Sequence, residues 1–253
     1  MSQPWEIYDA LLDGLPDDVV VRTAGQGPRW SRVLNSAGGG GTAWTMDVRS
    51  RPALSGDGPL DGRPLRDVGA LAKSWNLAEA SIGQAAINSW YSREQTAADN
   101  GFEPTGEGLT WRQVFDPYRE MIVGKRVAVI GHFPFAEAAL AGAGEYICLE
   151  RNLQPGDWPD SACEYVLPEC DLVFISSSSF VNKTAPRLIE LSRQAHTVLV
   201  GPSTPLNPVL LDYGVDTITG FVAARSLSDP ISLAEMVPAG DIGPGFRVHR
   251  HRA

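Results

Sequence analysis

The chain has 253 residues, of which 43% are hydrophobic and 20% are charged, with 26 Gly and 19 Pro. This composition excludes a disordered or fibrous protein, and the length suffices for one large domain or two small ones. With 21 Lys and Arg against 30 Asp and Glu, the formal net charge is −9, so the field of the protein repels nucleic-acid phosphates and anionic membrane surfaces. We therefore expect neither a nucleic acid nor a membrane as a partner.

Membrane insertion and export are not expected either. No apolar run approaches the ~20 residues of a membrane-spanning helix, and residues 1–15 carry acids but no Lys or Arg, unlike a signal peptide. We therefore expect a cytoplasmic protein. The cysteines Cys148, Cys163 and Cys170 match no paired zinc-binding spacing, and their odd number argues against a disulfide framework. We expect reduced, packed thiols.

The first part of the chain, residues 1–121, has the pattern of an α+β domain. Its apolar and turn residues predict a helix and then an antiparallel meander of three strands, at 5–15, 19–24, 30–34 and 42–46. We interpret the glycines at 38–41 as the turn before the third strand. Two helices follow at 64–74 and 77–92, and a polar arm at 96–117 leads to the second part of the chain.

Local signals specify the start of the helix at 77–92. Asn76 is predicted to cap it, and Glu79, three residues later, is predicted to reach back and complete a capping box. Gly83 lies in a stripe of small residues on this helix. We therefore expect another segment of backbone to approach the helix closely at Gly83.

From residue 122 to 253 the pattern changes to short β-branched runs that alternate with helices. The predicted strands lie at 126–130, 146–149, 171–175, 197–200 and 217–221. Such alternation predicts an α/β domain in which helices cover a parallel sheet. Because ligands of open parallel sheets bind beyond the carboxyl ends of the strands, candidate site residues are expected directly after each strand.

The loop after the first of these strands reads Gly131-His132-Phe133. A dinucleotide fingerprint needs glycine where Phe133 stands, so ordinary NAD binding is not favoured. Glu150 closes the second strand where an acid often holds a ribose hydroxyl, which keeps nucleoside recognition open. His132 is the only histidine in a predicted strand-end loop. Its imidazole can act as an acid, a base or a metal ligand, although a lone histidine is more often structural.

The third strand runs into a loop rich in hydroxyls. Ser176 and Ser177 directly follow the strand, and Asn182 and Thr184 precede a helix predicted at 185–194. Hydroxyls and free amides at a helix start bind anions, but they also cap helices and turns. Both interpretations stay open for this loop.

The fourth strand leads into a loop with three prolines that begins at Gly201. Its Ser203 and Thr204 either contact a ligand or satisfy the backbone of their own turn. The terminal run 247–252 carries His249 and His251, which we expect to be solvated. The sequence contains no Walker lysine loop, no H-E-x-x-H and no G-x-S-x-G.

Four segments in this order resemble the putative heavy-metal chelation family, formerly a domain of unknown function. They are SWNLAEASIGQAAIN (74–88), VIGHFP (129–134), FIS with NKT (174–176 and 182–184) and GPSTPLNP (201–208). The resemblance extends from about residue 19 to 246. It implies an enolase-N-terminal-like domain followed by a Rossmann-like domain, with a site in the cleft between them. By position, that cleft would be lined by Glu79, Asn88, Gly131, His132, Phe133, Ser177, Asn182, Thr184, Ser203 and Thr204.

Three functions remain open. The first is binding of a small anionic ligand or a metal chelate in the cleft, with His132 as an occasional ligand of a transition-metal ion. The second is an enzyme that uses a nucleoside cofactor of the NAD or S-adenosylmethionine type, with Glu150 on the ribose. The third is an assembly protein without catalysis, for example a homo-oligomer. Because the sequence shows no dense Cys, His and Asp cluster, we expect a metal held mainly by a small chelating molecule.

Overall fold

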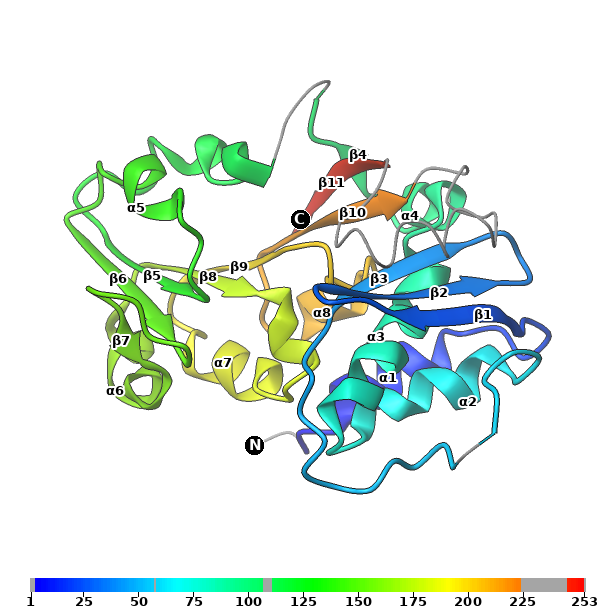
Figure 1. Cartoon of the computed structure of the whole chain (residues 1–253). Helices are drawn as coiled ribbons and strands as arrows, with labels where there is room; N and C mark the ends of the chain where they lie inside the picture. Colours follow the sequence, from blue (N-terminus) through cyan, green and yellow to red (C-terminus); the bar gives the residue numbers. More distant parts are fainter. Residues whose placement is uncertain (1–2, 57, 107–110, 224–244, 253) are drawn as a thin grey trace.

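The computed structural model describes residues 3–56, 58–106, 111–223 and 245–252. It has an α+β fold with a three-stranded antiparallel sheet and a mostly parallel eight-stranded sheet, consistent with two domains (Figure 1). The helices are α1 (Glu6–Asp13), α2 (Leu65–Ala70), η1 (Leu71–Lys73), α3 (Leu77–Tyr91), α4 (Glu94–Asp99), η2 (Trp111–Gln113), η3 (Asp116–Tyr118), α5 (Ala136–Ala139), η4 (Asp160–Ala162), α6 (Cys163–Val166), η5 (Leu167–Glu169), η6 (Ser177–Phe180), α7 (Ala185–Leu191) and α8 (Val209–Asp212). The strands are β1 (Val21–Gln26), β2 (Trp30–Asn35), β3 (Gly40–Trp44), β4 (Glu103–Pro104), β5 (Arg126–Ile130), β6 (Glu145–Glu150), β7 (Trp158–Pro159), β8 (Leu172–Ser176), β9 (His196–Val200), β10 (Thr217–Ala223) and β11 (Gly245–His251).

The small sheet is the antiparallel meander that the sequence predicts. β2 pairs with β1 on one side and with β3 on the other, and α3 packs across β2 and β3. β1 begins at residue 21 rather than 19, and β3 begins at residue 40 rather than 42. The small sheet, α2 and α3 together are called the amino-terminal unit below.

The early start of β3 corrects the interpretation of the glycines at 38–41. Gly38 does form the turn, with φ of +78°, but Gly40 and Gly41 already belong to the strand. A Cβ at Gly41 would collide with the carbonyl oxygen of Ala85 and the amide nitrogen of Ser89 on α3. Glycine is therefore needed at this position so that the strand can lie directly against the helix.

The start of α3 agrees with its predicted cap. The Asn76 side chain accepts a hydrogen bond of 3.2 Å from the Glu79 amide, as an N-cap residue does. The capping box is not completed, because the Glu79 carboxylate instead accepts hydrogen bonds from the loop at 48–56. Gly83 allows the predicted close approach, since a Cβ there would collide with the backbone of Ala72 in η1.

The large sheet has the strand order β4-β11-β10-β9-β8-β5-β6-β7. The strands from β10 to β7 in this order run parallel, and β11 runs antiparallel to β10. After β5 the chain adds β6 and β7 on one side and then crosses to β8 on the other. The strand order therefore reverses between β5 and β8, which is where open parallel sheets bind ligands.

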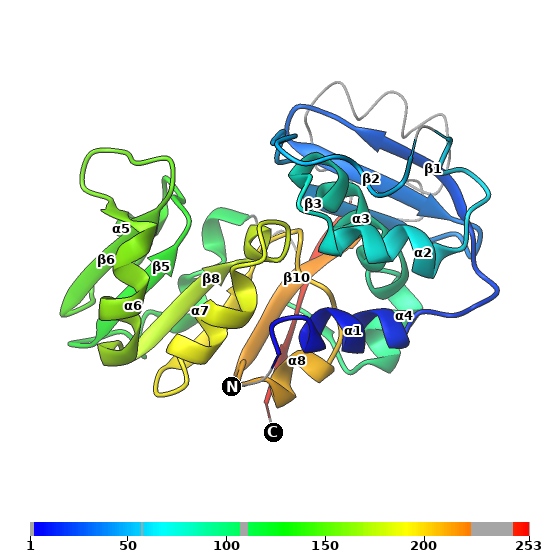
Figure 2. The same cartoon turned by 90° about the horizontal axis from the view of Figure 1, so that it is seen from below.

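Helices cover both faces of this sheet (Figures 1 and 2). α6 and α7 pack on one face, against β-strand residues such as Ala128 and Val173. Residues 111–122 and α5 cover the other face, against Val127 and Val129. Because successive strand residues point to opposite faces, β5 is buried on both sides, as its continuous apolar run predicts.

The terminal run 247–252 lies mostly in a strand that the sequence did not predict, although His251 is exposed, as expected, and His249 is half-buried. It forms most of β11, which pairs with β10 on one side and with β4 on the other. Val248 is buried against the core and Arg247 is buried as well. One valine among basic residues gives too weak an apolar pattern to predict a strand. β4 joins the large sheet from the first 121 residues, and the domain boundary at residue 121 stays a prediction.

A continuous apolar core joins the amino-terminal unit to the face of the large sheet that carries α6 and α7. α1 lies in this core. The Tyr8 hydroxyl donates a hydrogen bond of 2.8 Å to the Phe180 carbonyl oxygen, and the two rings pack edge to face. Buried apolar contact of this kind holds units in a fixed arrangement, which is not expected of units joined by a linker alone.

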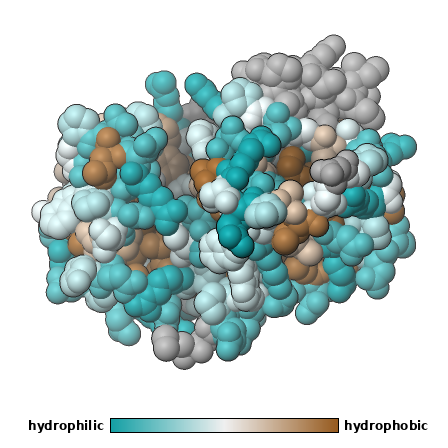
Figure 3. Space-filling model, turned by 60° about the horizontal axis from the view of Figure 1, so that its bottom comes forward, coloured by the Kyte–Doolittle hydropathy of each residue, from teal (hydrophilic) through white to brown (hydrophobic). Residues whose placement is uncertain are grey.

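The helices in the described part of the chain do not show the long apolar stretch of a membrane-spanning segment, because none has the length and apolar character required to span a bilayer. On the face shown in Figure 3, hydrophobic residues form separate small patches among hydrophilic ones.

Candidate functional site

The loops after β5, β8 and β9 meet at one edge of the large sheet, as the sequence predicts. Gly131 follows β5 with φ of +101°, and a Cβ there would lie 2.9 Å from Ser176 Cβ at the end of β8. Gly201 follows β9 with φ of +132°, and a Cβ there would lie 2.6 Å from Ser177 Oγ. Both backbone conformation and space therefore require glycine at these two positions.

Ser203, Thr204 and Asn88 lie buried where this edge meets the amino-terminal unit. The Trp44 amide donates to Ser203 Oγ (2.8 Å), and Asn88 Nδ2 donates to the carbonyl oxygens of Ser203 (3.0 Å) and Thr42 (2.8 Å). The Thr204 hydroxyl donates to backbone carbonyls of its own loop and of β10. These polar groups satisfy one another, so this part of the edge fastens the two units together.

Glu79, in the first turn of α3, binds the loop at 48–56 through hydrogen bonds. Its carboxylate accepts hydrogen bonds from the amides of Leu54 (2.8 Å) and Ser55 (2.7 Å). Burial acts to raise the pKa of Glu79, but these bonds and one from the Ser74 side chain outweigh it and lower the pKa below its usual value. Glu79 is therefore an ionised, nearly buried carboxylate.

Asn182 and Thr184 shape the loop between β8 and α7. The Asn182 side-chain oxygen accepts hydrogen bonds from the amide (3.1 Å) and the hydroxyl (2.6 Å) of Thr184. Thr184 stands at the N-cap position of α7, with a proline in the first turn, but its hydroxyl makes no capping bond. Ser176 Oγ lies 3.0 Å from Ser178 Oγ in the same loop.

Phe133 anchors the loop after β5. Its ring packs edge to face against Phe115, with centroids 5.7 Å apart, and lies 5.9 Å from the ring of Phe135. Phe115 is fully buried in the core on this face of the sheet. The aromatic cluster thus fixes the backbone beside His132.

Glu150 holds the same loop from the neighbouring strand. Its carboxylate accepts hydrogen bonds from the amides of His132 (2.8 Å), Arg151 (2.7 Å) and Asn152 (2.9 Å). The sequence suggested this carboxylate as the acceptor of a hydrogen bond from a ribose hydroxyl, but it already accepts hydrogen bonds from these three backbone amides. In this structure Glu150 positions the backbone around His132.

His132, Cys148 and Asp157 bring three metal-ligating atoms together at this place. His132 Nδ1 lies 3.0 Å from Asp157 Oδ1 and 4.0 Å from Cys148 Sγ, and one ligand atom from each residue lies within 4.8 Å of the others. They come from the loop after β5, from β6 and from the turn before β7. The expectation that the chain lacks a Cys, His and Asp cluster is therefore wrong, because the fold assembles one from separate segments.

These separations suit a tetrahedral metal ion. With bonds of ~2.0 Å to nitrogen and oxygen and ~2.3 Å to sulfur, tetrahedral angles place N and O ~3.3 Å apart and N and S, or O and S, ~3.5 Å apart. The observed N–O and N–S distances are 3.0 and 4.0 Å, and all three ligand atoms lie within 4.8 Å of one another, so side-chain shifts of roughly 1 Å or less bring them to metal-bonding distances. The Asp157 side chain is 3% exposed and that of His132 is 36% exposed, which leaves one side of the cluster open to a further ligand.

The protonation states of Cys148 and Asp157 are compatible with binding of a cation. Burial, followed by the neighbouring Asp157, raises the pKa of Cys148 to about 12. Burial acts to raise the pKa of Asp157, but hydrogen bonds from the Cys148 thiol, the Gln154 amide and His132 lower it below its usual value. The aspartate is therefore ionised and the thiol protonated. A cation entering the cluster replaces the thiol proton and stabilises the thiolate.

Sequence reasoning found His132 but missed its two neighbours. Cys148 is buried as predicted, yet its sulfur faces His132 instead of serving packing alone. Asp157 precedes β7, a strand of two residues that gives no pattern in the sequence. One signal was available for Cys148, because parallel pairing of β5 with β6 sets it opposite Val129, near the loop that carries His132.

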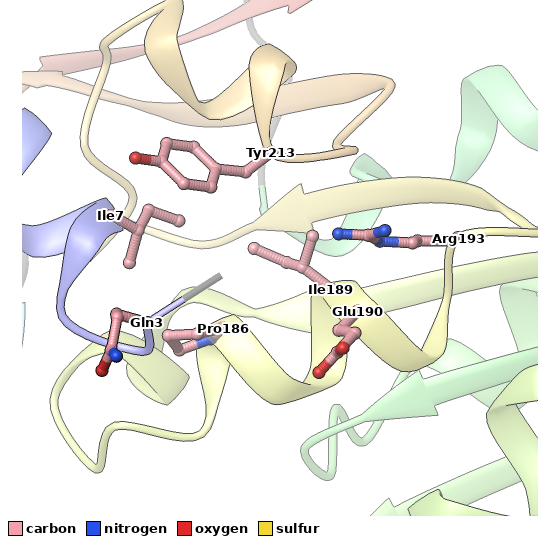
Figure 4. Close-up of a pocket in the computed structure, with 7 residues that line it drawn as sticks. All are labelled: Gln3, Ile7, Pro186, Ile189, Glu190, Arg193 and Tyr213. Carbon is pink, nitrogen blue, oxygen red and sulfur yellow. The ribbon is translucent and has the colours of Figure 1, made fainter. Parts of the chain in front are cut away.

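A shallow hollow lies elsewhere, between α1, α7 and the end of α8 (Figure 4). Its lining consists of Gln3, Ile7, Pro186, Ile189, Glu190, Arg193 and Tyr213. None of the candidate residues above contributes to it.

The fold and this geometry define an α+β protein with a cluster of His, Cys and Asp side chains beside the edge of its larger sheet at which the strand order reverses. Two family models, both described as "Putative heavy-metal chelation", match the chain, DUF4213 over residues 8–91 and DUF364 over residues 113–246. The chain belongs to this family, as its resemblance in sequence implied.

Solved structures share the fold along the whole chain. A protein of unknown function from the DUF364 family of Desulfitobacterium hafniense DCB-2 is 36% identical, with a TM-score of 0.85 and 98% of each chain covered. Another from Pyrococcus horikoshii is 22% identical, with a TM-score of 0.77 and coverage of 98% of this chain and 99% of that one, a likeness in fold alone. Comparison with curated proteins gives no match.

Proposed function

We propose that this protein binds a divalent transition-metal ion through His132, Cys148 and Asp157. The observation that carries the proposal is the approach of their ligand atoms to within 4.8 Å of one another. A mixed nitrogen, sulfur and oxygen set suits Zn²⁺ and related borderline metals, whereas Mg²⁺ and Ca²⁺ prefer oxygen alone. The description of the family as heavy-metal chelation supports the same class of ligand.

Water or a small anionic chelating molecule completes the coordination in this proposal. Three protein ligands with an open side are the usual arrangement of a site that exchanges its fourth ligand, while closed structural sites use four. The side chain of His132 is the exposed part of the cluster, so a small ligand reaches the metal there.

The location also fits the domain types that the resemblance implies. We propose that the amino-terminal unit is enolase-N-terminal-like and that the large-sheet unit is Rossmann-like. The reversal of strand order between β5 and β8 supports the second assignment. In this proposal the metal lies beside β5 and β6, whereas Asn88 and Ser203 close the junction between the units.

The other two functions gain no support. The carboxylate of Glu150 is occupied by backbone amides, which removes the main argument for a ribose of an NAD or S-adenosylmethionine type cofactor. No feature of the described residues favours an assembly role over metal binding. The proposal itself requires no catalysed reaction.

Equilibrium dialysis of the metal-stripped full chain against Zn²⁺ tests the proposal. The expected result is one Zn²⁺ per chain, with binding lost in His132→Ala and strongly weakened in Asp157→Asn. His249→Ala and Cys163→Ser are matched controls, because they remove the same groups outside the cluster and should bind as the wild type does. Absence of stoichiometric binding to the wild type, or equal binding by all variants, contradicts the proposal.

Thermal melts give an independent readout of the same binding. A ligand present at 100 times its Kd stabilises the folded state by ~2.7 kcal/mol. For a chain of this size that corresponds to a rise in Tm of ~5–10 °C. The wild type and the two controls should show the rise, and His132→Ala should not.

A further inference from the structure

Lys183 differs from the other two lysines of this chain. Lys73 and Lys125 pair with aspartates at the surface. Among the described residues, no carboxylate lies within salt-bridge distance of Lys183 Nζ, which donates instead to the Val181 carbonyl oxygen at 2.8 Å. The amine thus folds back over its own loop, and the charge of Glu79 acts on it only from beyond salt-bridge distance.

The backbone at Lys183 is strained. It has φ of +67°, and no other non-glycine residue in the described part of the chain has a positive φ. A long side chain in this region costs ~1 kcal/mol, and such strain gathers at functional sites. Hydrogen bonds between Asn182 and Thr184 on either side hold the conformation in place.

The amino-terminal unit supplies the surroundings of this amine. The Trp75 ring centroid lies 5.7 Å from Lys183 Nζ, and Trp75 is 57% exposed. Glu79, whose charge acts on Lys183, holds the amide of Leu54, another exposed apolar residue. The exposed Trp75 ring is therefore an aromatic neighbour of the Lys183 amine where the two units meet.

The charge state of the amine follows from this environment. Burial lowers the pKa of Lys183 to about 8, and the opposing effect of Glu79 offsets only part of the shift. Near pH 8 about half of the side chains carry a neutral, nucleophilic amine. An ordinary lysine, with a pKa of ~10.4, is only ~0.4% neutral at that pH.

We propose that Lys183 forms an imine with the aldehyde or ketone group of a small planar molecule that packs against Trp75. The neutral Nζ attacks the carbonyl carbon, a C=N bond forms, and both amine protons leave with the carbonyl oxygen as water. Lysines desolvated in this way are the usual imine-forming residues of proteins. This site is separate from the metal ligands and does not depend on the metal.

Reductive trapping tests the proposal on the full chain. The protein is incubated at pH 8 with benzaldehyde and sodium cyanoborohydride, and labelled lysines are quantified by peptide mass spectrometry. Lys73 and Lys125 serve as internal standards. We expect Lys183 to be labelled at least tenfold faster than either. Labelling of all three lysines at similar rates, or slowest labelling of Lys183, overturns the proposal.

Two variants test the Lys183 amine and the Trp75 ring separately. Lys183→Arg should abolish the fast labelling and leave that of Lys73 and Lys125 unchanged. Trp75→Ala should slow labelling by benzaldehyde several-fold but not labelling by formaldehyde, which is too small to use the ring. An unchanged benzaldehyde rate in Trp75→Ala overturns the assignment of a planar ligand. His132→Ala should label as the wild type does, so this proposal and the metal proposal can fail separately.

Discussion

Metal binding at Cys148 must displace a proton, and the size of this competition follows from the structure. Burial and the neighbouring Asp157 raise the pKa of the thiol to about 12. At pH 7.5 the thiolate fraction is therefore ~10⁻⁴·⁵, and forming the thiolate costs ~6 kcal/mol at 1.36 kcal/mol per pKa unit. The bond between the metal and sulfur must exceed this cost for Cys148 to serve as a ligand.

The consequence is a defined pH dependence of affinity. As the pH rises towards the pKa of Cys148, the proton competes less, so the affinity for Zn²⁺ rises tenfold per pH unit from this thiol alone. Cys148→Ser is the matched control, because a serine hydroxyl keeps its proton in this range. Competition against a chromophoric chelator, at several pH values between 7 and 9, gives the apparent Kd of both proteins.

The difference in slope between the two plots of log Kd against pH shows whether Cys148 loses its proton on binding the metal. The plot of log Kd against pH should be steeper for the wild type than for Cys148→Ser by about one log unit per pH unit. Contributions from other groups of the cluster are common to both proteins and cancel in this difference. Parallel plots would show that Cys148 does not bind the metal as a thiolate.

Three further predictions concern stability, measured by urea denaturation. Gly41→Ala, whose Cβ collides with the backbone of α3, should cost more than ~3 kcal/mol. Gly38→Ala, which meets no neighbour, should cost only ~1 kcal/mol. Similar costs for the two would contradict the close packing. Asn88→Ala removes two buried bonds to carbonyl oxygens and should cost ~2–4 kcal/mol, and a loss below ~1 kcal/mol would mean that the junction does not depend on it. Burial raises the pKa of Cys163 to about 12, above the unfolded value of ~8.5. The contribution of the protonated Cys163 thiol to the free energy of unfolding is therefore complete below pH ~8.5. It is lost as the pH rises towards 12, by up to ~1.4 kcal/mol per pH unit. Cys163→Ala should decline less steeply between pH 9 and 10.5, and an equal decline would contradict the assignment.

The parts of the fold that were predicted correctly depend on local signals. Asn76 caps α3 because its own side chain reaches the amide of Glu79, and the apolar run of β5 needs burial on both faces wherever the neighbouring strands lie. β11 and β4 could not be predicted in this way. Most of their residues are polar or charged, and β11 pairs with the edge of β10 while β4 pairs with the edge of β11, edges that exist only after folding.

The candidate site was likewise predictable in some features and not in others. Topology predicts that the loops after β5, β8 and β9 share an edge, and the contacts of Gly131 and Gly201 confirm it. A sequence does not show whether a polar side chain is already satisfied. Asn88 and Ser203 have the chemistry of ligand-binding residues, yet in the structure Asn88 Nδ2 donates to the Ser203 carbonyl oxygen and Ser203 Oγ accepts from the Trp44 amide of β3. Asp157 becomes a neighbour of His132 only through the turn before β7.

In the proposed site, His132, Cys148 and Asp157 hold one metal ion together. Titration of the metal-stripped chain with Co²⁺ reports on Cys148 itself, because bound thiolate gives Co²⁺ a charge-transfer absorption that imidazole and carboxylate do not give. We expect this absorption to saturate at one Co²⁺ per chain in the wild type and in Cys163→Ser and to be absent from Cys148→Ser. An absorption that persists in Cys148→Ser, or that never develops in the wild type, would show that these three residues do not share a metal ion.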